Sequence, residues 1–123
     1  MSVPKAERSI FIQGRTWFQS SSGNTYNSVA VFVDGKLRFS LGRDYGYGDT
    51  WETRATAELD RLGYTNTTNW EHISTYCQNA GIDYYSCLQE VKKNQLFSAQ
   101  LDESDLKIIQ DTLHFWRVVD QLN

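Results

Sequence analysis

The sequence contains little proline and cysteine and lacks any long apolar run. Its 123 residues include one Pro and two Cys, and 40% of them are hydrophobic. So little proline argues against a disordered or linker-like chain, and this hydrophobic fraction is enough to close one core. No apolar stretch reaches the roughly 18 residues that cross a membrane, and the charged N-terminus lacks the apolar part of a secretory signal. We therefore expect one soluble, cytoplasmic domain spanning residues 1–123.

Motifs for catalysis and metal binding are missing as well. Cys77 and Cys87 have no CxxC pair or neighbouring histidine pair, which favours free thiols over a zinc site. His72 and His114 are accompanied by no serine elbow and no HExxH pattern, and no carboxylate pair stands out as catalytic. The sequence therefore predicts a non-enzymatic protein without a metal or a cofactor.

The net charge of −3 is unevenly distributed along the chain. Residues 1–48 carry a net charge of +3, and residues 49–123 carry −6. This balance argues against non-specific coating of DNA, because such coating needs many Lys and Arg side chains to neutralise phosphates. It leaves room for a local contact between the basic N-terminal part and an anion.

Three strands are predicted in the basic part, from β-branched and aromatic residues and from alternation of side chains. The candidate strands are residues 9–19, 26–33 and 36–41. Asp34-Gly35, between the last two, is a strong hairpin signal. A two-residue turn would place Val31 on the same face as Arg38, whereas a three-residue loop pairs Val31 with Leu37 and gathers one apolar face. We therefore predict the three-residue loop.

Helical patterns follow in the acidic part. A capping box at Asp49 opens a helix that ends near Leu62, and a second box at Thr68 opens a helix that stops at Gly81. Residues 82–93 fit helical spacing but have strand propensity, and we favour an extended segment that pairs with the sheet.

Together these elements predict an α+β fold. We expect an antiparallel meander of three to four strands, packed with two to three helices. The meander occupies residues 1–48, and residues 49–123 are mainly helical. The last element is a long amphipathic C-terminal helix over residues 102–121.

The predicted register leaves an aromatic and basic face opposite the apolar one. Its side chains include Phe11, Gln13, Arg15, Trp17, Tyr26, Phe32, Lys36 and Arg38. Such a face can bind a single nucleic-acid strand, because bases stack on the rings while the cations meet phosphates. Alternatively, the C-terminal helix or the 82–93 segment covers this face and makes it a second core.

A glycine and tyrosine loop follows the third strand. Residues 43–48 interleave Gly with Tyr, and the hairpin tip at residues 23–26 joins them in one candidate site. Glycine lets a backbone approach a ligand closely, and tyrosine supplies a flat surface at little entropic cost. The alternative is a loop that packs on its own domain. Phosphate binding at the next helix is disfavoured, because Asp49 at its cap would repel an anion.

Four segments of the first half carry a family resemblance. They are RTWFQ at residues 15–19, GNTYNSV at 23–29, VDG at 33–35 and YGYG at 45–48. In these segments the chain resembles a group of small uncharacterised proteins from phages and other mobile elements. The resemblance implies a short accessory protein, for which binding or inhibition is commoner than catalysis, and it carries no specific activity.

These observations lead to one main prediction, a binding protein whose ligand is a nucleic-acid strand or a nucleotide. The predicted ligand-binding residues are Arg15, Trp17, Gln19, Asn24, Tyr26, Arg43, Tyr45, Gly46, Tyr47 and Gly48. The alternative is a protein-binding inhibitor of a host or defence factor, which would use the acidic C-terminal helix or the aromatic loop. A small hydrolase is the third hypothesis. We expect no membrane partner, and the C-terminal helix offers a route to an oligomer.

Overall fold

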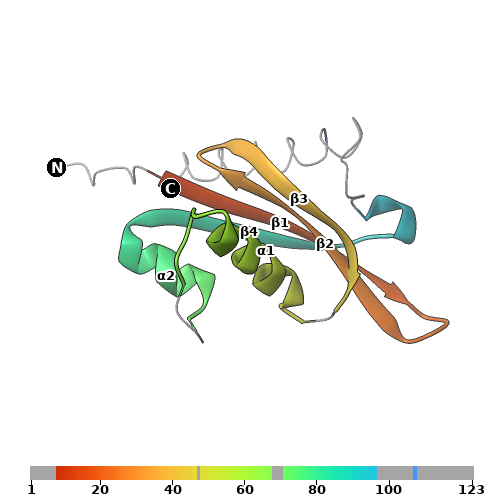
Figure 1. Cartoon of the computed structure of the whole chain (residues 1–123). Helices are drawn as coiled ribbons and strands as arrows, with labels where there is room; N and C mark the ends of the chain where they lie inside the picture. The colour runs from red at the N-terminus through yellow and green to blue at the C-terminus, as the bar shows by residue number, and fades with distance from the viewer. Residues whose placement is uncertain (1–7, 47, 68–70, 97–106, 108–123) are drawn as a thin grey trace, which may run out of the picture.

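The computed structural model describes residues 8–46, 48–67, 71–96 and 107, and it has a four-stranded sheet with two α-helices on one face (Figure 1). The strands are β1 (Arg8–Gln19), β2 (Asn24–Val33), β3 (Lys36–Tyr45) and β4 (Ile82–Glu90), and the helices are α1 (Thr50–Arg61), α2 (Ile73–Ala80) and the 3₁₀ turn η1 (Lys93–Gln95). The spatial order of the strands is β3-β2-β1-β4. The α+β prediction is confirmed.

The direction of β4 corrects the predicted meander. β1 and β2 pair antiparallel, as do β2 and β3, but β4 runs parallel to β1, from Arg8 opposite Ile82 to Thr16 opposite Glu90. A parallel neighbour needs a long crossover, and α1 and α2 supply it between β3 and β4. The sheet is therefore mixed, so the purely antiparallel arrangement is wrong, while the extended segment predicted at 82–93 is confirmed over Ile82–Glu90 and ends before η1 begins at Lys93.

The β2–β3 hairpin also departs from the prediction. Asp34 and Gly35 have φ angles of 56° and 80°, as in a two-residue turn of type I′. The predicted three-residue loop is therefore wrong. Without a further irregularity, this turn would place Val31 opposite Arg38. A bulge shifts the ladder by one residue, so that Val31 lies opposite Phe39 instead, and not opposite Leu37 as predicted. The bulge restores the apolar face that the predicted loop was meant to provide.

The two helices begin and end for different local reasons. α1 follows Asp49, whose side chain makes no capping hydrogen bond, and Gly63 with φ 86° lies just beyond its end. α2 starts later than the predicted box at Thr68, because the His72 imidazole accepts the hydrogen bond from the Ser74 amide. Gly81 closes α2 in the left-handed region, as predicted.

The helix-covered face of the sheet is the main core. Gly14 in β1 is required there, because a Cβ atom at this position would lie 2.5 Å from Cε3 of Trp51. Strand side chains of this face pack against apolar positions of α1 and α2. The cluster comprises Ile10, Ile12, Val29, Val31, Val33, Trp51, Ala55, Leu59, Ile73 and Cys77.

The second face is buried at its centre too, although α1 and α2 lie on the other side (Figure 1). Phe11, Ala30 and Phe32 form a small apolar cluster, and Gln13 and Arg15 beside them are also buried. Phe11 and Phe32 therefore do not offer exposed rings to a nucleic-acid strand. Any surface site on this face lies toward the end where the β1–β2 hairpin turns.

Two further predictions meet the structure only in part. The expected C-terminal helix at residues 102–121 lies outside the described residues, apart from Lys107. In the part of the chain that the structure describes, no helix is both long enough and apolar enough to span a membrane.

Candidate functional site

Three aromatic rings form a row across the strands at the hairpin end of the second face. Trp17 in β1 lies opposite Tyr26 in β2, which in turn lies opposite Tyr45 in β3. Direct cross-strand partners share a face, so their rings meet. The Trp17 and Tyr26 rings are stacked, with centroids 5.5 Å apart and planes 23° apart. Tyr45 meets Tyr26 edge-on at 6.0 Å, and 51% of its surface is exposed.

A cation lies over each ring of the stacked pair. The Lys93 Nζ atom is 5.6 Å from the centroid of the Trp17 ring, and the Arg43 Cζ atom is 5.4 Å from that of Tyr26. The inner ring faces contact each other, so the order is cation, ring, ring, cation. We call Lys93, Trp17, Tyr26 and Arg43 the cation-capped stack. Both cationic residues are exposed.

Arg15 links β1 to η1, the turn that contains Lys93. Its side chain is only 2% exposed, and its Nη1 atom donates a hydrogen bond of 2.6 Å to the Gln95 carbonyl oxygen. Gln95 belongs to η1, which also contains Lys93. Arg15 thus fastens η1 to the sheet and holds Lys93 near Trp17, in place of the surface position predicted for it.

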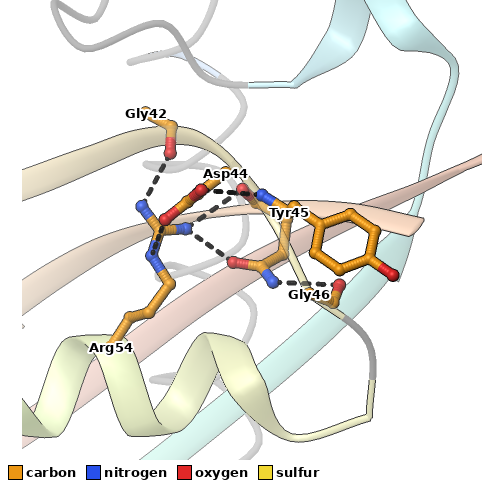
Figure 2. A network of polar contacts seen from close by, with 6 residues as sticks. Gly42, Asp44, Tyr45, Gly46 and Arg54 are labelled. Carbon is orange, nitrogen blue, oxygen red and sulfur yellow. Dashed lines mark hydrogen bonds and ion pairs between the residues drawn. The ribbon is translucent and has the colours of Figure 1, made fainter. Parts of the chain in front are cut away.

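A second arginine fixes the β3 side of the site from the helical face. Arg54 of α1 donates through Nη1 to the Asn27 Oδ1 atom at 2.6 Å and to the Asn27 carbonyl oxygen at 3.1 Å, and through Nη2 to the Gly42 carbonyl oxygen at 2.8 Å (Figure 2). Its Nε atom is 3.7 Å from an Asp44 carboxylate oxygen. Burial lowers the pKa of Arg54 below its ordinary value, and the charge of Asp44 opposes that effect. The network ties α1 to β2 and β3 where their ladder is irregular.

The same network sets the backbone around Tyr45. The Asp44 carboxylate accepts a hydrogen bond of 2.8 Å from the Tyr45 amide, and the Asn27 side-chain amide donates to the Gly46 carbonyl oxygen at 3.2 Å (Figure 2). Gly46 is buried, and a Cβ atom there would lie 2.6 Å from the Thr50 methyl carbon. Glycine at this position therefore serves packing within the domain, which was the alternative reading of the loop.

The remaining predicted residues of the site are distributed around the stack. Gln19 and Asn24 are partly exposed cross-strand partners at the hairpin end, and the Gln19 side-chain Oε1 atom accepts a hydrogen bond of 2.8 Å from the Ser22 hydroxyl. Gly48 is exposed with φ 68°, and Tyr47 lies outside the described residues. The structure thus brings together Trp17, Tyr26, Arg43 and Tyr45, with Gln19 and Asn24 beyond them.

Lys93 was missing from the predicted site. The basic pair at Lys92 and Lys93 was visible at the end of the extended segment. What could not be inferred was the parallel pairing of β4 with β1, which carries η1 to the end of the sheet where Trp17 lies.

Another polar cluster joins α1, α2 and β4 on the helical side. The Tyr84 hydroxyl donates to the Glu52 carboxylate, and His72 Nε2 lies 3.5 Å from the other Glu52 oxygen. Burial, followed by the hydrogen bond to Glu52, raises the pKa of Tyr84 well above its ordinary value. These contacts link three elements. Among residues 8–46, 48–67, 71–96 and 107, no three His, Cys, Asp or Glu side chains gather as a metal site would require.

Comparison with known proteins adds no relative to this description. No protein-family model, curated protein or solved structure matches this chain.

Proposed function

We propose that the protein binds a nucleic-acid strand or a nucleotide at the cation-capped stack. The observation that carries this proposal is the stack of the half-buried Trp17 and Tyr26 rings, which has a cation over each ring and the exposed Tyr45 beside it. Stacking of a base on an aromatic side chain contributes about 1–3 kcal/mol, whereas an exposed cation over a ring contributes about 0.5–1 kcal/mol. A base that replaces Lys93 on Trp17, or Arg43 on Tyr26, is therefore favoured.

The displaced cations have a second role in this proposal. Lys93 and Arg43 are exposed side chains with long flexible stems, so each can move from a ring to a phosphate a few ångströms away. Two phosphate contacts on a single strand predict a slope of about −1.4 for the logarithm of affinity against that of salt concentration. Binding is thus moderately sensitive to salt.

This proposal agrees with the setting that the sequence resemblance implies. The protein would be a non-enzymatic accessory protein of a phage or other mobile element, acting in the cytoplasm of the host cell. Its net charge of −3 limits non-specific binding to duplex DNA, so recognition depends on unpaired bases that can stack.

Fluorescence anisotropy of a labelled oligothymidylate tests the proposal. We expect Trp17→Ala and Tyr26→Ala each to weaken binding by about 5- to 100-fold, because each removes a stacking ring. Phe18→Ala is the matched control, since Phe18 follows Trp17 in β1, points to the other face and is 61% exposed. Equal affinities for the wild type and both ring variants would contradict the proposed site.

A second candidate is binding of a host protein or defence factor. It is favoured by two large exposed side chains near the hairpin end, Phe18 on the helical face and Tyr45 on the second face. The same variants separate the two candidates. Phe18→Ala should weaken capture of a protein partner while leaving the affinity for oligonucleotide unchanged.

A further inference from the structure

The two outer ring faces of the cation-capped stack lie on opposite sides of one ring pair. The Trp17 outer face is under Lys93, next to β4, and the Tyr26 outer face is under Arg43, on the β3 side. The inner faces are closed because the two rings stack on each other. A nucleic-acid strand whose bases stack on both rings must therefore pass around the edges of the ring pair.

We infer that the stack contains two separate base sites and that its ligand is a single strand of at least three nucleotides, lying across the β-strands. This inference rests on the proposed function and adds the length and direction of the ligand. Trp17 and Tyr26 are direct cross-strand partners, so the line through their rings runs across the sheet from the β4 side to the β3 side.

The separation of the two sites sets the minimum length. The ring centroids of Trp17 and Tyr26 are 5.5 Å apart, and each stacked base adds about 4.5–7 Å, so the two bases lie about 15–20 Å apart. Neighbouring nucleotides of a stacked strand rise by only about 3.4 Å. One bridging nucleotide would cover only about 7 Å at that rise, so the two bound bases are not neighbours, and the nucleotides between them, at least one in number, are unstacked and extended around the ring edges.

Each end has its own supporting contacts. On the β4 side, the buried Arg15 holds η1 and hence Lys93 beside Trp17. On the β3 side, the exposed Tyr45 ring stands edge-on to Tyr26 and adds a second aromatic surface for the base. When bases occupy both ends, the released cations lie near the linking phosphates.

A length series of oligothymidylates from one to eight nucleotides tests the inference by calorimetry. Short oligonucleotides occupy one end only, so their affinities should be similar. Oligonucleotides that bridge the stack gain from tethering, so affinity should rise at least tenfold over one or two added nucleotides, at a length of three or more. Trp17→Ala and Tyr26→Ala should each remove this step and leave single-site binding, whereas Phe18→Ala should retain it.

The controls separate failure of the inference from failure of the proposed function. If no oligonucleotide binds, the proposed function is wrong. A smooth rise of affinity with length, or a step that survives Trp17→Ala in a variant with native circular dichroism, overturns the two-site inference alone. Lys93→Gln retains both rings, so it should reduce the salt dependence and preserve the step.

Discussion

The two faces of the sheet are built from the same strands yet differ in what they bury. The helix-covered face is apolar along β1 and β2 and packs on α1 and α2. The second face changes along β1 from Phe11 through the buried polar Gln13 and Arg15 to the stacked Trp17. One face thus stabilises the fold, and the other turns gradually from core into surface.

Arg15 is the residue at which that change occurs. It is buried like a core residue, yet its guanidinium donates to the Gln95 carbonyl oxygen and so orders Lys93, an exposed cation of the stack. Core and site on the second face are therefore connected, whereas on the helical face the core is closed.

Truncation on the helical face should have the largest effect on stability. Ile12→Ala removes a fully buried side chain and should lower the free energy of unfolding by about 2–5 kcal/mol. Urea denaturation measures this loss. Phe18→Ala on the same strand face is the exposed comparison and should change stability by less than about 1 kcal/mol. Equal losses from the two variants would refute the assignment of the core.

The Arg54 network should rank next. Arg54→Met removes charge-assisted hydrogen bonds to Asn27 and Gly42, so we expect a loss of about 2–3 kcal/mol in urea denaturation (Figure 2). Arg61→Met is the matched variant, because Arg61 pairs with Glu58 at the exposed surface of the same helix. That variant should lower the free energy of unfolding far less, because the pair is screened by solvent. Similar losses from the two variants would show that the Arg54 network stabilises the protein no more than an exposed ion pair does.

Alkaline pH should destabilise the protein through Cys77, which is buried in the core on the helical face. Burial raises the pKa of Cys77 from 9.0 to about 11, so the unfolded chain loses this proton first as pH rises. The contribution of Cys77 is fully present below pH 9 and disappears between about pH 9 and 11, a loss of about 2–3 kcal/mol from this thiol. Urea denaturation at several pH values measures it. The fall of the free energy of unfolding with pH should be smaller in Cys77→Ala. An unchanged fall would contradict the raised pKa of Cys77 as its cause.

Replacing a buried polar residue of the second face should have the smallest effect on the free energy of unfolding, and should increase it. Gln13 is fully buried and its Nε2 atom donates to the Gln89 side-chain Oε1 atom at 3.0 Å, but no described residue donates to the Gln13 Oε1 atom. Gln13→Leu removes this unsatisfied group, and we expect a gain of about 1 kcal/mol in a thermal or urea melt. A loss of stability would mean that the polar group is better accommodated than the described contacts indicate.

Local features of the fold were readable from sequence. Alternation identified β1 to β3, and Gly81 marked the end of α2. The direction of β4 was not readable, because its alternation is the same in a parallel or an antiparallel ladder. The bulge that places Val31 opposite Phe39 was missed for a related reason, since one inserted residue leaves no clear signature in the pattern.

The candidate site was predicted in part. Trp17 and Tyr26 could be found because they are aromatic residues on one face of adjacent strands. Arg15 was misjudged as a surface cation, because burial depends on η1, whose position follows from long-range pairing. Gly46 was read as a ligand contact, although its close neighbour is Thr50 of the following helix.

We propose that the ligand binds at the cation-capped stack and not on the helical face. Two-dimensional NMR of the indole groups tests it most directly, with Trp17 assigned through a Trp17→Phe variant and Trp51 of the helical core as internal reference. On titration with an oligothymidylate, we expect the Trp17 indole resonance to move until binding is saturated, while the Trp51 indole resonance stays in place. An oligonucleotide that binds without moving the Trp17 resonance would contradict it.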